Sequence, residues 1–246
     1  MADYARINAL ILAAGEDSPK SAVIDTANDF AYFGCMTSPG KVVKLRLTDF
    51  TEIATLILAA GENSLYSAVF DPDNGYAYFG TDTTPGKVVK IRLSDFTRVG
   101  SITLAAGENS PLSAVFDPDN GYAYFGCNTS PGKVVKIRLS DFTEVGTLTL
   151  ATGEDSLRSA VIDTANGFAY FNCDVSPGII VKIRLSDFTK VGTLTLATGE
   201  DFPWSAVIDA ANGYAYFGTD SSPGKVVLLQ TWTSSLLDYS LLLGIR

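Results

Sequence analysis

The side chains that could bind a ligand recur in two series of positions spaced 46 residues apart, as Lys20 is from Tyr66. The residue type changes along each series, although the residues around it hardly change. Aromatic rings and cations beside carboxylates suit the binding of a polar ligand or a peptide, and we interpret the two series as a binding rim. The alternative is that exposed loop tips tolerate substitution. The first series is Lys20, Tyr66, Leu112, Arg158 and Trp204, and the second is Met36, Asp82, Asn128, Asp174 and Asp220.

A glutamate follows a glycine at the same interval throughout the sequence. Five such carboxylates on one face could hold a cation, or each could bind backbone amides within its own turn. We favour the turn, because like charges that face one another at close range are unfavourable. The five residues are Glu16, Glu62, Glu108, Glu154 and Glu200.

Residues 71–75 and 117–121 both read Asp-Pro-Asp-Asn-Gly, which invites comparison with a calcium loop. A calcium site needs six to eight oxygen ligands, including a distant bidentate carboxylate. The sequence offers no such carboxylate at a fixed spacing. Proline, aspartate, asparagine and glycine in this order are typical of tight turns, so we predict hairpin turns here.

The sequence contains no histidine, which removes the commonest general base and every imidazole–metal site. Cys35, Cys127 and Cys173 fall at equivalent positions of different copies. We expect these positions to lie too far apart for a disulfide, which requires Cα atoms within about 7 Å. The cysteines are therefore predicted to be half-buried free thiols, and neither a metal site nor a cofactor is indicated.

Composition predicts a globular protein with ample core, at 46% hydrophobic and 18% charged residues. The net charge of -9 argues against binding to nucleic acid and to anionic membranes. No apolar run approaches the roughly 20 residues that a membrane span needs, and repeat sequence begins almost directly after Met1, with no signal peptide. We expect a soluble protein and leave its compartment open.

Four short segments in each copy have the composition of β-strands. In the third copy they are 113–117, 122–126, 133–139 and 144–150, all rich in Val, Ile, Phe, Tyr or Thr. In residues 133–139, alternation places Val135, Ile137 and Leu139 on one face and Lys136 and Arg138 on the other, which indicates a strand with one wet side.

Four antiparallel strands per repeat predict an all-β fold, a five-bladed β-propeller of four-stranded blades, with a β-solenoid as the alternative. The termini favour the propeller. Residues 3–12 align with 49–58, and so supply a lone fourth strand, whereas the last copy ends after its third strand near Gln230. We therefore predict 20 strands, from 1 + 4×4 + 3, and a ring closed by pairing of the N-terminal strand with the last blade. Residues 1–230 form the domain, and residues 231–246 form a non-repeat tail.

The first two strands of each copy, with the intervening turn, resemble the YVTN family of β-propeller repeats. The segment 113–126, Ser-Ala-Val-Phe-Asp-Pro-Asp-Asn-Gly-Tyr-Ala-Tyr-Phe-Gly, carries this resemblance. Tyr-Phe-Gly stands where the family's name motif has Val-Ala-Asn. The resemblance implies the propeller fold within a lactonase-like and NHL-like group. It assigns no catalytic residue, because the fold alone transfers no function.

Three functions stay open at this point. We predict a non-enzymatic binding or interaction propeller whose ligand is a carbohydrate or a peptide. An amplified repeat array without a specialised site fits the sequence equally well. The third function is a lactonase-like hydrolase using channel carboxylates and a metal, which the lack of histidine and of an asymmetric acid–base cluster disfavours. The apolar tail could cap one face or mediate self-association.

Overall fold

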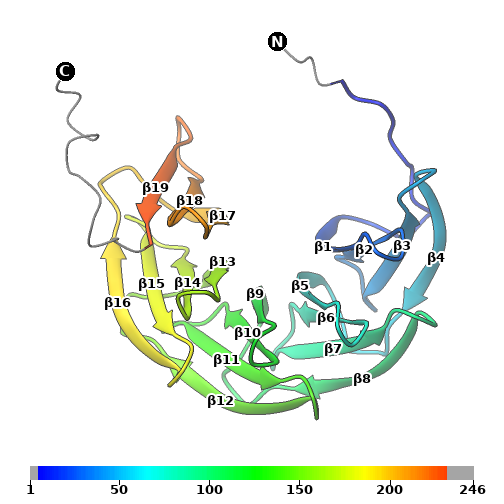
Figure 1. Ribbon diagram of the computed structural model, residues 1–246, viewed down its shortest axis with the longest axis horizontal. Helices are drawn as coiled ribbons and strands as arrows, with labels where there is room; N and C mark the ends of the chain where they lie inside the picture. The colour runs from blue at the N-terminus through cyan, green and yellow to red at the C-terminus, as the bar shows by residue number, and fades with distance from the viewer. Residues whose placement is uncertain (1–4, 232–246) are drawn as a thin grey trace.

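The computed structural model describes residues 5–231, and every regular element in this range is a β-strand. The strands form five antiparallel sheets, each made of strands that follow one another in sequence. We call these sheets blades 1–5. Figure 1 shows them arranged around a common centre, with the first strand of each blade innermost and the last one outermost. The predicted all-β architecture of repeated blades is thus confirmed.

Strand bounds repeat at the interval of the sequence. Within residues 5–231, blades 1–4 contain four strands each and blade 5 contains three. In sequence order the strands are β1 (Pro19–Asp25), β2 (Phe30–Cys35), β3 (Lys41–Arg46) and β4 (Thr51–Ile57) in blade 1; β5 (Leu65–Asp71), β6 (Tyr76–Thr81), β7 (Lys87–Arg92) and β8 (Thr97–Thr103) in blade 2; β9 (Pro111–Asp117), β10 (Tyr122–Cys127), β11 (Lys133–Arg138) and β12 (Thr143–Thr149) in blade 3; β13 (Leu157–Asp163), β14 (Phe168–Cys173), β15 (Ile179–Arg184) and β16 (Thr189–Thr195) in blade 4; and β17 (Pro203–Asp209), β18 (Tyr214–Thr219) and β19 (Val226–Gln230) in blade 5.

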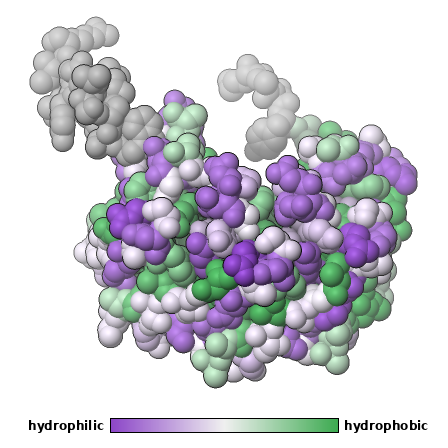
Figure 2. Space-filling view, turned by 60° about the horizontal axis from the view of Figure 1, so that its bottom comes forward, coloured by the Kyte–Doolittle hydropathy of each residue, from purple (hydrophilic) through white to green (hydrophobic). Residues whose placement is uncertain are grey.

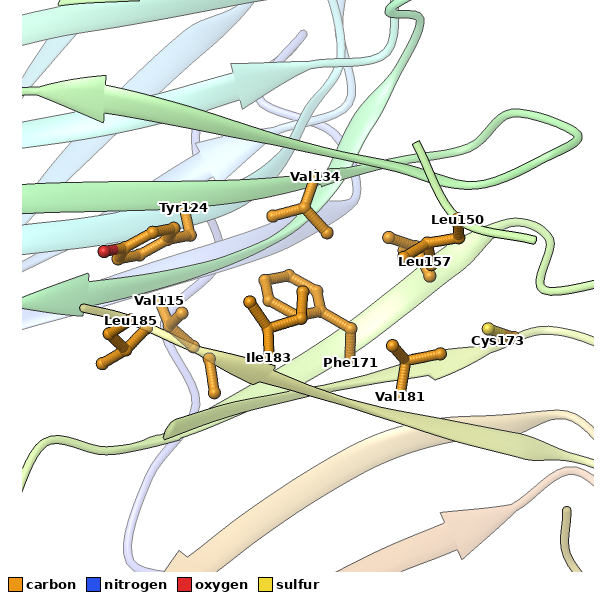
Figure 3. Close-up of a cluster of buried hydrophobic side chains, with 11 residues drawn as sticks. Val115, Tyr124, Val134, Leu150, Leu157, Phe171, Cys173, Val181, Ile183 and Leu185 are labelled. Atoms are coloured by element: carbon orange, nitrogen blue, oxygen red, sulfur yellow. The ribbon is translucent and has the colours of Figure 1, made fainter. Parts of the chain in front are cut away.

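The hydrophobic core lies between blades rather than inside them. At the junction of blades 3 and 4, Val115, Tyr124 and Val134 of blade 3 face Phe171 and Ile183 of blade 4 (Figure 3). Equivalent residues form the other junctions. Each blade between two neighbours therefore buries both faces, and the first strands lie side by side in the order β1, β5, β9, β13 and β17.

This packing corrects the prediction of a third strand with one wet side. In β11 the neighbouring residues Val134 and Val135 are both buried, although they point to opposite faces. Lys136 lies among aromatic rings, with its Nζ 3.9 Å from the ring centroid of Tyr122. The ammonium is accommodated there by cation–π attraction, because a neighbouring blade covers this face as well.

Closure of the predicted ring of 20 strands is not detected among residues 5–231. The described part of the sequence forms 19 strands, and within it β19 has no outer neighbour. Figure 1 shows a gap between blades 5 and 1. Val207 is 65% exposed at the edge of this gap, whereas its counterpart Val161 at a closed junction is 6% exposed. Similar residues repeat at each junction and set similar steps between blades, and the steps from blade 1 to blade 5 stop short of a full circle.

The N-terminal segment packs on blade 1 instead of pairing with blade 5. Residues 5–12 form no strand, and Leu10 and Leu12 lie against Cys35, Val43 and Leu45. Leu12 thereby takes the place that the buried Leu58 takes one repeat later. The prediction of a strand at residues 3–12 is wrong for residues 5–12, and residues 1–4 lie outside the described range.

The structure bears only in part on two other predictions, those about the C-terminal tail and about membrane crossing. Residues 232–246 lie outside the described range, and with them nearly all of the tail and the self-association predicted for it. Within residues 5–231, no helix has the length and apolar content that a membrane crossing requires. Figure 2 shows hydrophilic and hydrophobic side chains interspersed on the face that it presents.

Candidate functional site

The two variable series lie on one face of the molecule. The first series occupies the second residue of each first strand, as Arg158 does in β13, rather than the loop before it, and the second series begins the loops between strands two and three. The loop before each first strand is hydrogen-bonded to the loop between strands two and three of the preceding blade. Ser64 N donates to Thr37 O at 2.9 Å, and Phe202 N donates to Val175 O at 3.1 Å. The backbone of each junction thus brings one member of each series into the same region. We call the ten variable residues the rim.

Contacts between the two series occur across blade junctions. Tyr66 Oη donates to Met36 Sδ at 3.0 Å, which joins blades 2 and 1. Trp204 Nε1 donates to Asp174 Oδ1 at 2.7 Å, which joins blades 5 and 4. Position 36 therefore faces position 66, and position 174 faces position 204.

The remaining rim residues are placed less uniformly. Leu112 is 6% exposed, and it lines the same hollow between the first strands as Tyr66 and Arg158. Asp82 is exposed and Asn128 is partly buried. Lys20 and Asp220 are both exposed, and they stand on blades 1 and 5 at the two ends of the open arc.

The best-defined polar arrangement on the rim is at the junction of blades 4 and 5. Asp174 accepts a hydrogen bond from Arg158 Nε at 2.9 Å as well as the bond from Trp204. The Arg158 guanidinium carbon lies 5.8 Å from the centroid of the Trp204 ring. One carboxylate, 13% exposed, thereby orients a guanidinium and an indole together. We call Arg158, Asp174 and Trp204 the junction cluster.

Three further residues around this cluster belong to neither of the two variable series. Val175 and Phe202 stand where the other copies carry Thr or Ser, and Asn172 replaces a glycine. Asn172 is fully buried, and its Oδ1 accepts hydrogen bonds from Ser159 N at 2.9 Å and Ser159 Oγ at 2.6 Å. The sequence could have identified these three residues, because each departs from the repeat at a position that is nearly constant in the other copies.

The mouth of the central channel adjoins the rim. Tyr66 and Arg158 line a shallow hollow of about 190 Å³ there, together with serines and alanines of the first strands. The serines themselves have structural roles, because Ser67 Oγ and Ser113 Oγ donate to carbonyl oxygens of the next blade at 2.7 and 3.1 Å. The polar chemistry at the mouth therefore comes from Tyr66 and Arg158.

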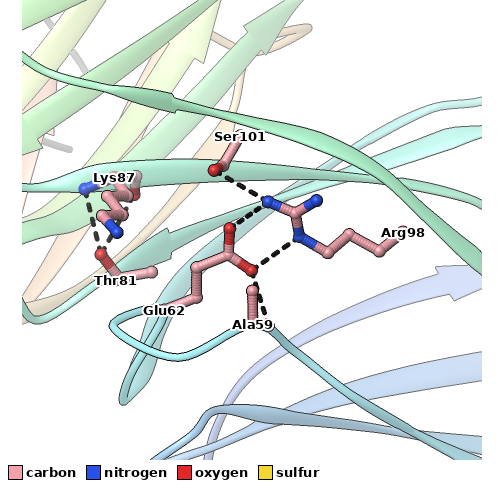
Figure 4. Close-up of polar contacts among 6 residues, drawn as sticks. All are labelled: Ala59, Glu62, Thr81, Lys87, Arg98 and Ser101. Atoms are coloured by element: carbon pink, nitrogen blue, oxygen red, sulfur yellow. Dashed lines mark hydrogen bonds and ion pairs between the residues drawn. The ribbon is translucent and has the colours of Figure 1, made fainter.

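The five repeated glutamates cap their own turns. Glu62 Oε2 accepts a hydrogen bond from Ala59 N at 3.1 Å, and each of the other four makes the equivalent bond. Arg98 binds both oxygens of Glu62 (Figure 4). Burial acts to raise the pKa of Glu62, but the bonds from Arg98 and its neighbours outweigh it and lower that pKa. The turn interpretation is confirmed.

The Asp-Pro-Asp-Asn-Gly segments are hairpin turns, as predicted. Asp117 is 1% exposed, and its two oxygens accept bonds from Asn120 N at 3.3 Å and Asn120 Nδ2 at 2.9 Å. Gly121 follows with a φ of 68°, a conformation that glycine adopts without strain. Among residues 5–231, no three Cys, Asp, Glu or His side chains are grouped as metal ligands would be.

The three cysteines are free thiols, but they are fully buried rather than half-buried. Burial raises the pKa of Cys35 to about 11, with a further contribution from Glu16, and raises the pKa of Cys127 and Cys173 to about 12. Thiols held in the protonated form are poor nucleophiles. Their place between packed blades makes them part of the core.

Comparison with known proteins identifies the fold and nothing finer. No family model and no curated protein matches the sequence. Among solved structures, that of U3-55K, a WD40 β-propeller protein, superposes with a TM-score of 0.73 at 9% identity, covering 89% of this protein and 63% of that one. The fold is therefore propeller-like. The present sequence spans less than two thirds of that neighbour's length, and at this identity the likeness concerns the fold alone. The resemblance to YVTN repeats stays a prediction.

Proposed function

We propose that this propeller-like protein is a non-enzymatic interaction scaffold that binds a protein segment on its rim. The observation that carries the proposal is the junction cluster, in which Asp174 holds Arg158 and the 53%-exposed Trp204 in fixed positions. Trp, Tyr and Arg are the residues that most often dominate protein–protein binding energy. Side chains that are ordered before binding lose less conformational entropy on association.

The architecture supports a scaffold role for the rim. Loops positioned by a rigid framework are the usual carriers of binding residues. Here the framework is nearly constant in all copies, whereas the rim carries different side chains at each junction. A surface of this kind presents one partner with several unlike contacts in a fixed arrangement.

A selection from displayed peptides tests this proposal. Random linear peptides are selected on immobilised wild-type protein, and the enriched peptides are measured against Trp204→Ala. We expect Trp204→Ala to weaken binding at least tenfold, while the control Ile57→Ala leaves it unchanged. Ile57 is 60% exposed at the outer edge of blade 1, so this control removes an apolar side chain away from the rim. Thermal unfolding of each variant shows that the fold is retained.

Two outcomes would contradict the proposal. The first is enriched peptides that bind Trp204→Ala as tightly as the wild type. The second is specific binding on a carbohydrate array that depends on Trp204 while no peptide is enriched. The non-enzymatic part of the proposal is tested separately, with the purified protein expected to hydrolyse no lactone in the presence or absence of added divalent cations.

A further inference from the structure

Residues unique to one copy gather at the rim side of the junction between blades 4 and 5. Val175 replaces the threonine or serine of the other copies, and Phe202 replaces a serine that all four others share. The backbone bond from Phe202 N to Val175 O places these two changes next to each other. A second tie, from Ser176 Oγ to Asp201 Oδ1 at 2.9 Å, also joins the two loops. This junction therefore carries apolar side chains at positions that are polar in the other copies.

The apolar side chains at this junction are accessible. Phe202 is 38% exposed and Trp204 is 53% exposed, while Val175 is partly buried beside them. Exposed aromatic rings in a fixed position are favourable contact sites for an apolar side chain of a partner.

The guanidinium of Arg158 has hydrogen-bond donors that no described residue engages. Its Nε is engaged by Asp174, and among the described residues its two terminal nitrogens make no hydrogen bond or ion pair. Arg158 also lines the hollow at the channel mouth, 31% exposed. The planar guanidinium presents N–H groups in a geometry that matches the two oxygens of a carboxylate.

The charges around this junction leave Arg158 as the place where an acidic group can bind. Asp174 is already paired with Arg158, whereas the exposed Asp220 lies beside Phe202, because its backbone N donates to Phe202 O at 3.0 Å. The protein as a whole carries a net charge of -9, so an acidic segment gains attraction only where a cation is presented locally.

We propose that the junction cluster recognises a carboxylate of a protein partner, either an acidic side chain or a C-terminal carboxylate, with an apolar side chain next to it. The carboxylate binds the free edge of the Arg158 guanidinium, and the apolar side chain packs on Trp204, Phe202 and Val175. This inference rests on the proposed interaction role of the rim and specifies the chemistry of the partner.

A double-mutant cycle tests the recognition. Peptides selected from a random linear library on the wild-type protein are compared with analogues in which each Asp or Glu becomes Asn or Gln and the C-terminus becomes an amide. We expect loss of one carboxylate to weaken binding to the wild type at least tenfold. The same change should have little effect on Arg158→Gln, because the partner of the carboxylate is already absent. Arg158→Lys keeps the charge but loses the planar fork, and should bind more weakly than the wild type.

The outcomes separate this inference from the role of the rim. If neutral analogues bind the wild type as well as the parent peptides do, while Trp204→Ala still abolishes binding, the carboxylate proposal is overturned and the interaction site stands. If neither Trp204→Ala nor Arg158→Gln affects any selected peptide, both are overturned. Asp174→Asn controls for positioning, since it is expected to weaken Arg158 and Trp204 contacts together without removing either side chain.

Discussion

At the scale of single residues, the repeated glutamate has a different interaction partner in different copies. Glu62 faces Arg98 and Glu154 faces Lys190, and both glutamates have a lowered pKa despite their burial. In blade 3 the equivalent partner of Glu108 is another acid, Glu144. Burial and the charge of Glu108 raise the pKa of Glu144. The same blade structure thus tolerates either an ion pair or a repulsive pair at this place.

We expect Glu144→Lys to stabilise the protein at pH 7, by about 0.5–1 kcal/mol for a solvent-screened pair. The pKa of Glu144 is higher in the folded than in the unfolded state. The stability linked to this group is therefore complete below the ordinary value of 4.5 and is lost as the pH rises through the raised value. The advantage of Glu144→Lys should accordingly shrink between pH 7 and pH 4 in urea unfolding experiments.

A charge-matched control distinguishes the local pair from net charge. Asp119→Lys makes the same change of charge at an exposed turn position of the same blade. Equal stabilisation by Asp119→Lys would show that relief of the overall negative charge, rather than the Glu108–Glu144 contact, accounts for the effect.

At the scale of elements, the hairpin between β9 and β10 depends on one aspartate. Asp117 is buried and accepts both hydrogen bonds from Asn120, whereas Asp119 is exposed. We expect Asp117→Ala to destabilise the fold by about 2 kcal/mol, because hydrogen bonds to a charged acceptor are lost at a buried site. Asp119→Ala should change the free energy of unfolding by less than about 0.5 kcal/mol. Equal effects of the two substitutions, measured by urea denaturation, would contradict this role.

The turns and strand positions could be predicted from sequence because they depend on local chemistry. Asp117 and Gly121 define a turn whatever surrounds it. The environment of β11 could not be predicted in the same way, since Lys136 reads as solvent-exposed until the neighbouring blade is placed over it. Alternation reports the two faces of a strand, but it does not report what covers each face.

The candidate site could likewise be predicted from the sequence only in part. The face shared by the two variable series follows from strand order, so their place on the molecule could be predicted. That Asp174 binds both Arg158 and Trp204, and that Leu112 is almost fully buried, depends on contacts between strands and between blades that no local pattern contains.

At the scale of the whole molecule, the ends of the arc differ from its junctions. Val161 and Val207 occupy equivalent positions, but only Val161 is covered by a following blade. We expect Val161→Ala to lower the free energy of unfolding by about 2 kcal/mol and Val207→Ala by less than about 0.5 kcal/mol. Closure of the ring in solution would bury Val207, and urea denaturation would then give similar effects for the two substitutions.

The open gap between blades 5 and 1 also shows why the local sequence did not determine closure of the ring. Complementary terminal strands predicted 20 strands and a closed circle, but the angle between neighbouring blades is set by junction packing. The repeat specifies that a blade packs on the next one. It does not specify that the fifth blade returns to the first.

The fluorescence of Trp204 reports on binding at the junction of blades 4 and 5, because the indole lies in the proposed interaction site. The sequence has two tryptophans, so Trp232→Phe leaves Trp204 as the only indole. This variant is titrated with a peptide selected on the wild-type protein while the emission is recorded. A saturable shift of Trp204 emission that is lost in Arg158→Gln is the predicted result. Binding confirmed by calorimetry with no change in Trp204 emission would show that the peptide binds elsewhere on the protein.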